Sequence, residues 1–184
     1  MKVLIVAHPD DEIIWFPAEY FDLIVIVFLA RHDKPYAAQS RKLALQEHPL
    51  KERLLLLGLD ESGYWKDNTR QQQYNEVKIN LFNSLMELNN QYKFTQIFTH
   101  NSVGEYGHDD HILVHELVKQ VFSGNTIYCP AIPVNNHKNN DYISLNNDIA
   151  FYEKAKSIYI KNKAWTWKMD YAPPKELIYQ LCEN

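Results

Sequence analysis

The chain has 184 residues, of which 46% are hydrophobic and 23% charged, and its formal net charge is -4 at pH 7. This length and composition fit one globular domain over residues 1–184 and exclude a disordered or fibrous chain. Scattered basic residues in an acidic chain argue against nucleic acid as a partner. No apolar run approaches a membrane span and the first residues do not form a signal peptide, so we expect a cytoplasmic protein.

The first predicted strand, residues 2–7, leads directly into a cluster of ionisable side chains. The strand is apolar on both faces, as a central strand of a parallel sheet is. The cluster consists of His8, Pro9, Asp10, Asp11 and Glu12. His8 and Asp11 are three residues apart, which puts them on one side of a tight turn, and imidazole and carboxylate are common ligands of Zn²⁺. The alternative is a plain helix start, because proline and acidic residues also favour a helix amino terminus.

The segment after this cluster predicts a parallel sheet. Residues 13–17 are bulky and apolar, and we expect them to pack against the turn or to line a pocket. A second strand over residues 23–29 is again apolar on both faces, and two buried strands joined by a short connection favour parallel pairing with crossover helices. The polar residues 31–34 follow this strand, so they are either substrate contacts or a solvated loop.

Three helices are predicted in the next part of the chain, over residues 40–47, 52–57 and 71–91. The second is expected to end at Gly58, and the third has apolar residues at helical spacing that suit packing on the sheet. Arg41 is a candidate contact for an anionic substrate group, although arginines on helices are usually solvated.

A second polar cluster follows the third predicted strand, residues 95–99. It contains Gly104 and Gly107, which give the backbone freedom to approach a ligand, and it leads into a helix from about residue 109. His108 and His111 are three apart at the start of that helix. His115 lies one further turn along, and we favour His111 as the metal ligand because the glycine-rich loop can bring it to the sheet edge.

The remainder of the chain carries less functional signal. We expect a strand over residues 126–131, a polar loop from Asn135 to Asn147, a helix over 148–161 and a short helix at the end of the chain. Trp165 and Trp167 either stack against a sugar ring or lie in the core. Cys129 and Cys182 fit no metal or redox spacing, so we expect both to be reduced.

The two clusters together resemble the paired signatures of the PIG-L/LmbE family of zinc-dependent de-N-acetylases. The resemblance rests on residues 7–12 and 107–111, in their order, their positions at strand ends and the three-residue histidine spacing. It implies a Rossmann-like α/β fold, with a mainly parallel sheet flanked by helices. It also implies removal of the acetyl group from an N-acetylated amino sugar, free or in a glycoconjugate.

Residue by residue, the resemblance implies that His8, Asp11 and His111 bind zinc, although Fe²⁺ would suit the same ligands. Asp10 matches the general base of the family, and His108 matches the histidine that assists at the oxyanion or the leaving amine. Tyr106 lies where some members place a tyrosine that contacts the substrate carbonyl.

Two other functions are compatible with the same residues. Hydrolysis of another bond, such as a phosphoester, would be favoured by a second metal and by further carboxylates, for which Asp33 and Glu105 are the candidates. We also expect Glu105 as a substrate contact. A binding module that holds a sugar without turnover is the other alternative, but binding alone would not require Asp10 and His108.

Overall fold

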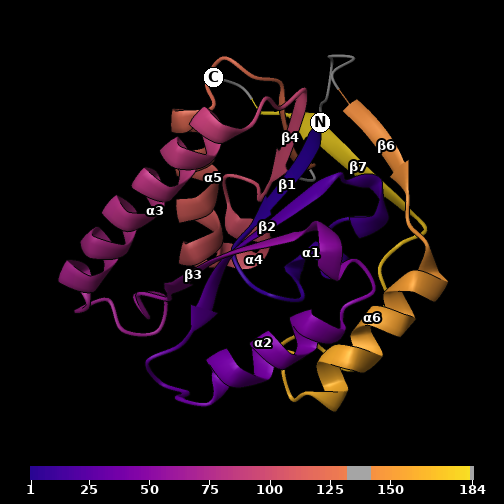
Figure 1. The fold of residues 1–184 in the computed structure, drawn as a ribbon, viewed down its shortest axis with the longest axis horizontal. Coiled ribbons are helices and arrows are strands. Elements are labelled where there is room, and N and C mark those ends of the chain that lie inside the picture. Colours follow the sequence, from indigo (N-terminus) through magenta and orange to yellow (C-terminus); the bar gives the residue numbers. More distant parts are fainter. Residues whose placement is uncertain (132–141, 183–184) are drawn as a thin grey trace.

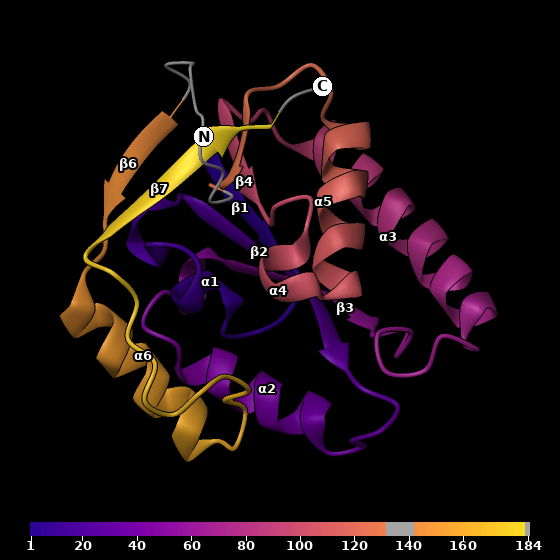
Figure 2. The ribbon, with the colours of Figure 1, turned by 180° about the vertical axis from the view of Figure 1, so that it is seen from behind.

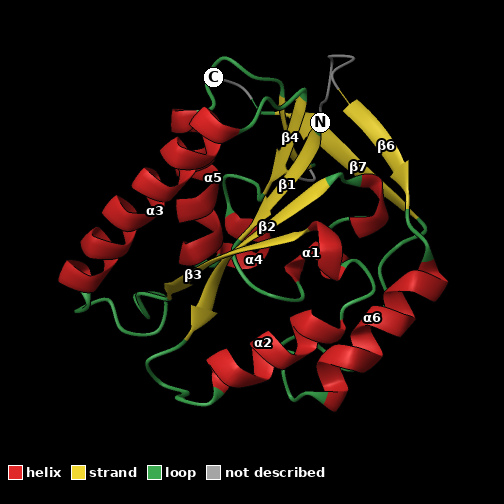
Figure 3. Cartoon of the chain, in the orientation of Figure 1, coloured by secondary structure: helices red, strands yellow, loops and turns green. Residues whose placement is uncertain are grey.

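The computed structural model describes residues 1–131 and 142–182. All the described strands belong to one seven-stranded sheet with the order β3-β2-β1-β4-β5-β7-β6 (Figure 1 and Figure 3). The strands are β1 (Lys2–Val6), β2 (Leu23–Ala30), β3 (Leu54–Asp60), β4 (Gln96–Thr99), β5 (Ile127–Pro130), β6 (Tyr142–Asn146) and β7 (Glu176–Leu181).

The sheet is parallel from β3 to β5, and β7 and β6 complete it by antiparallel pairing. The chain first builds outward from β1 through β2 to β3 and then returns to add β4 and β5 on the other side of β1. The strand order therefore reverses between β1 and β4. In open α/β sheets, ligands bind at this reversal, beyond the carboxyl ends of the strands.

Helices cover both faces of the sheet (Figure 2). Those longer than one turn are α2 (Ala37–Glu47), α3 (Gln71–Gln91), α5 (Asp109–Val121) and α6 (Ile149–Lys161), and the short ones are α1 (Asp11–Ile14), α4 (Gly104–Gly107) and the 3₁₀ turns Ala18–Tyr20 and Lys51–Arg53. Among the described residues, none of the helices is both long enough and apolar enough to cross a membrane.

The two faces of β1 explain its unbroken apolar sequence. Val3 and Ile5 pack with α3 and α5 in one buried cluster, while Leu4 and Val6 pack with α1, α2 and α6 in another. All four side chains are fully buried. A strand covered on both sides has no solvated face and needs no polar alternation.

The structure confirms the predicted α/β class, the four predicted strands and the helices at 40–47, 71–91, 109 onward and 148–161, within a few residues at their ends. Two predicted helices are wrong. Residues 52–57 lie mostly in β3, because pairing with β2 overrides the helical preference of its leucines. The expected terminal helix is instead β7, whose half-buried Leu177 and buried Tyr179 alternate with exposed positions.

The predicted polar loop from Asn135 to Asn147 is also wrong in part. Its residues 142–146 form β6, which pairs with β7 along its whole length. Its residues 135–141 lie outside the described part of the chain.

Candidate metal centre and active site

The carboxyl ends of four neighbouring parallel strands gather the polar residues of the site. His8 follows β1 by two residues, Arg31 follows β2, Glu61 follows β3 and His100 follows β4. His8, Glu61 and His100 are buried. The topology thus brings side chains that are distant in sequence to one edge of the sheet.

His8, together with Asp11 and His111, provides three atoms that form a triangle with equal sides. His8 Nδ1, Asp11 Oδ2 and His111 Nε2 lie 3.3 Å from one another. A tetrahedral zinc ion with ligand bonds of about 2.0–2.2 Å has ligand-to-ligand edges of about 3.3–3.6 Å. The donor types and their spacing therefore both fit a zinc ion or a similar divalent metal.

Each histidine of this triangle is oriented by a carboxylate on its other ring nitrogen. His8 Nε2 lies 3.3 Å from Asp110 Oδ2, and His111 Nδ1 lies 2.7 Å from Glu105 Oε2. Metal-binding histidines commonly donate their second N–H to a carboxylate, which fixes the tautomer and the ring orientation. The arrangement leaves the two nitrogens of the triangle as metal-binding lone pairs.

The electrostatics of the triangle favour a positive charge at its centre. Burial opposes the charge on His8, but the carboxylates of Glu61, Asp11 and Asp110 outweigh it and raise its pKa to about 9. Burial likewise opposes the charge of Asp11, but His111, His100 and His8 hold its pKa well below the usual value. A divalent cation would displace the proton that His8 holds on the triangle side of its ring, so metal binding would release a proton.

Asp10, which precedes the triangle residue Asp11, has a strained backbone conformation. Its φ is 90°, in the left-handed region, and its N–H donates to Glu12 Oε2 at 2.9 Å. One carboxylate oxygen accepts two hydrogen bonds from Thr166, and the other, Oδ1, is buried without a partner in the described residues. Burial, and then the charges of Asp11 and Glu12, raise the pKa of Asp10 well above its usual value. This carboxylate is therefore a stronger proton acceptor than an ordinary aspartate.

His108 is held in one tautomer by the start of α5. The backbone N–H of Asp110 donates to its Nδ1 at 3.2 Å, so the neutral ring carries its proton on Nε2. Burial, and then the positive rings of His8 and His111, lower the pKa of His108 to about 3. The neutral ring thus offers an N–H donor to the site.

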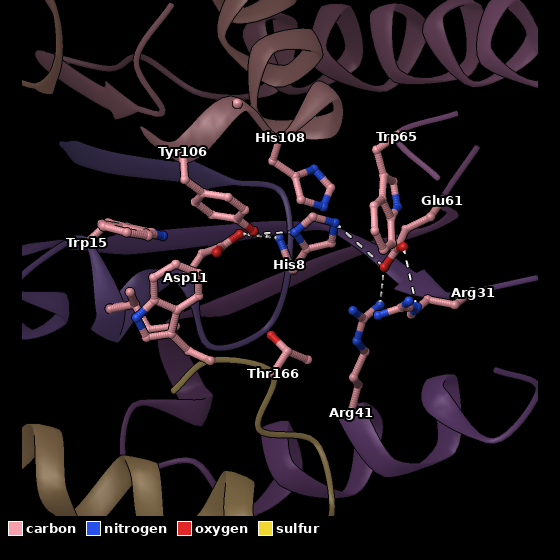
Figure 4. Close-up of a pocket in the computed structure, with 13 residues that line it drawn as sticks. His8, Asp11, Trp15, Arg31, Arg41, Glu61, Trp65, Tyr106, His108 and Thr166 are labelled. Carbon is pink, nitrogen blue, oxygen red and sulfur yellow. Dashed lines mark hydrogen bonds and ion pairs between the residues drawn. The ribbon is translucent and has the colours of Figure 1, made fainter. Parts of the chain in front are cut away.

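A cavity of about 220 Å³ opens over His8, Asp11 and His108, while Asp10 and His111 lie outside its lining (Figure 4). Its floor includes His8 and Asp11. Tyr106 lies at one side, and its ring centroid is 4.9 Å from that of Trp167 and 6.1 Å from that of Trp15. Cavities for drug-sized ligands have about 300–1,000 Å³, so this one suits the end group of a substrate.

The opposite side of the cavity carries fixed charges. Arg41 donates from Nη1 to Glu61 Oε1 at 2.7 Å and to the carbonyl of Leu29 at 3.0 Å, and both side chains are buried. Arg31 Nε lies 3.6 Å from Glu61 Oε2. These side chains line the cavity together with Trp65 (Figure 4).

Most of the predicted site residues come together here. His8, Asp11, His108, Tyr106 and Arg41 line the cavity, and His111 lies buried beneath it.

The structure places Glu105, predicted as a substrate contact, against the rings of His100 and His111 rather than in the cavity lining, at 3.0 and 2.7 Å. Asp33, the other extra carboxylate considered, is engaged by Arg31 and Lys66.

Trp15 lines the cavity, which was one of the two expectations for residues 13–17. Trp167 lines it as well. His115 is not part of the triangle and donates from Nδ1 to the carbonyl of His100 at 2.7 Å.

Sequence reasoning missed Glu61, Trp65 and Thr166. Each comes to the cavity from a segment without a recognisable motif, and the strand before Glu61 was itself predicted as a helix.

The sequence matches no protein-family model and no curated protein. Its structure is similar to that of a deacetylase of the teicoplanin biosynthesis pathway in complex with teicoplanin, with a TM-score of 0.61, 9% identity and coverage of 98% of both chains. It is also similar to the A40926 pseudoaglycone deacetylase, with a TM-score of 0.54, 11% identity and coverage of 88% of this chain and 78% of that one. At these identities the likeness concerns the fold, so this chain has the α/β fold of these deacetylases.

Proposed function

We propose that the protein is a metal-dependent hydrolase that removes the N-acetyl group from an N-acetylated amino sugar or its conjugate, releasing acetate and a free amine. The triangle of His8 Nδ1, Asp11 Oδ2 and His111 Nε2, with sides of 3.3 Å, carries the proposal. The fold shared with the deacetylase of the teicoplanin pathway and with the A40926 pseudoaglycone deacetylase supports amide hydrolysis as the reaction.

Zinc is the metal that the three side chains would hold, and Fe²⁺ or Co²⁺ would suit the same donors. A bound zinc ion lowers the pKa of water and polarises a carbonyl oxygen, so no protein nucleophile is needed.

Asp10 is the proposed general base. Its Oδ1 has no partner in the described residues, while Thr166 fixes the other oxygen and so the direction of the carboxylate. Asp10 would take a proton from the water that attacks the acetyl carbon, and would pass it to the amine as the C–N bond breaks.

His108 and Tyr106 are the proposed donors to the acetyl oxygen. The Nε2–H of His108 is available in the neutral ring, because Nδ1 accepts from the backbone. Burial, and then nearby carboxylates, raise the pKa of Tyr106, so its hydroxyl keeps its proton. Donors fixed before the reaction stabilise the negative charge that develops on the oxygen.

The sugar is proposed to lie between the aromatic side of the cavity and its charged side. Trp15, Tyr106 and Trp167 offer apolar ring surface, against which the face of a sugar can pack. Arg41 and Glu61 are held by each other and offer polar atoms for hydroxyl groups.

The test is acetate release from a panel of N-acetylglucosamine conjugates by the zinc-loaded protein. Asp10→Asn should keep its zinc and lose about 10²- to 10⁴-fold in turnover, because it removes the general base and leaves the ligands in place. Asp170→Asn is the matched control, because Asp170 is exposed. Near-normal turnover by Asp10→Asn would contradict the role of Asp10, and zinc-loaded protein inactive on every N-acetyl substrate would contradict the proposed reaction.

A further inference from the structure

A second cluster of metal-binding side chains lies on the α5 side of the sheet, and the proposed reaction uses none of them. It consists of His115 on α5, Cys129 on β5 and Cys182 just after β7. His115 and Cys129 are buried, and Cys182 is partly buried. One ligand atom from each residue lies within 4.8 Å of the other two.

Strand pairing explains why two cysteines so distant in sequence meet. β5 and β7 are antiparallel, with Cys129 opposite Gln180, and the ladder continues as Cys182 N donates to the carbonyl of Ile127 at 2.8 Å. Cys182 is therefore two residues beyond the partner of Cys129, on the same face of the sheet. The two thiols are diagonal neighbours.

This diagonal position does not suit a disulfide. Diagonal neighbours in an antiparallel pair have Cα atoms about 7–8 Å apart, whereas disulfides usually join Cα atoms about 4.4–6.8 Å apart. An ion between the two sulfurs adds two metal–sulfur bonds of about 2.3 Å and spans the longer gap.

His115 is oriented as a metal-binding histidine is. Its Nδ1–H donates to the carbonyl of His100 at 2.7 Å, and a carbonyl can only accept. The proton of the neutral ring is thereby fixed on Nδ1, and Nε2 keeps a lone pair that can bind a metal.

A cysteine binds a metal as its thiolate, so zinc binding here would release the protons of both thiols.

We propose that His115, Cys129 and Cys182 bind a second divalent metal of the zinc type, separate from the triangle of His8, Asp11 and His111. Two thiolates and one imidazole are ligands that zinc prefers, with water completing the tetrahedron beside the partly exposed Cys182. This inference does not depend on the proposed deacetylase activity. Such an ion would tie the C-terminal strand β7 to α5.

Cobalt distinguishes the two sites by spectroscopy. The protein loaded with Co²⁺ should show a thiolate-to-cobalt charge-transfer band, which nitrogen and oxygen ligands cannot produce. The double variant Cys129→Ser/Cys182→Ser should lose the band and the metal bound here, whereas His111→Ala should keep both. An absent band in the wild-type protein, or a band that survives in the double variant, would overturn the proposal.

A second measurement uses the wild-type protein, so it does not depend on whether a variant folds. Zinc should slow alkylation of Cys182 in the wild-type protein by about tenfold or more, because a coordinated thiolate is not free to attack. Equal alkylation with and without zinc would overturn the proposal, as would a mass showing that the two cysteines form a disulfide in the metal-loaded protein.

Discussion

A single carboxylate, that of Glu105, holds two histidine rings beneath the cavity. Its Oε2 lies 2.7 Å from His111 Nδ1 and 3.0 Å from His100 Nδ1, and its Oε1 accepts the N–H of Asn101 at 2.9 Å. Burial opposes its charge, but His100 and His111 lower its pKa to about 2, so it remains a carboxylate. Glu105 adopts a left-handed backbone with φ of 57° to reach this position.

Glu105→Gln should weaken zinc binding at the triangle by about 10- to 100-fold, which is typical for loss of a carboxylate that orients a metal-binding histidine. The measurement is a competition titration with a zinc chelator, made in the Cys129→Ser/Cys182→Ser background so that only one site is counted. Glu116→Gln, at an exposed position of α5, is the control. Equal affinities in the two variants would contradict this role of Glu105.

The tautomer of His108 leads to a prediction about pH. Because folding lowers its pKa from 6.5 to about 3, the ring should stay neutral from pH 5 to 8 with its proton on Nε2. Folding favours the neutral form of His108. The stabilisation of the folded protein that results is therefore complete above pH 6.5 and is lost as the pH falls toward 3. Nitrogen-detected NMR of the histidine rings checks this, and a midpoint near 6.5 for His108 would contradict it.

At the scale of elements, helix α6 supports the first motif through one hydrogen bond. The hydroxyl of Tyr159 donates to Glu12 Oε1 at 2.7 Å, and both side chains are buried. The other oxygen of Glu12 accepts the N–H of Asp10. The contact between α6 and α1 therefore stabilises the strained turn that presents Asp10.

Tyr159→Phe should lower the free energy of unfolding by about 1–3 kcal/mol, because it leaves a buried carboxylate oxygen without its hydroxyl donor. Denaturant titration of the variant and the wild-type protein measures this difference. Tyr36→Phe removes the same hydroxyl from a side chain that is 85% exposed and should leave the free energy of unfolding nearly unchanged. A similar effect of both substitutions would contradict the argument.

At the scale of the whole molecule, the reversal of strand order between β1 and β4 assembles the site. His8 follows β1 and His111 follows β4 by way of α4, so the ends of adjacent strands bring together side chains 103 residues apart. These were the residues that sequence predicted, because each sits beside a strong apolar strand and within a dense polar motif.

What the sequence could not predict depends on contacts between distant segments. Thr166 comes to Asp10 from a loop without a motif, and the pairing of β5 with β7 brings Cys182 to Cys129. The leucines of β3 favour a helix locally, and only pairing with β2 makes them a strand.

The most direct test of the account is an anomalous difference map from a crystal of the zinc-loaded protein, recorded above and below the zinc absorption edge. We expect a zinc peak at about 2.0–2.2 Å from each of His8 Nδ1, Asp11 Oδ2 and His111 Nε2. A protein that carries zinc but shows no peak at this triangle would contradict the claim that the two motifs form one metal centre.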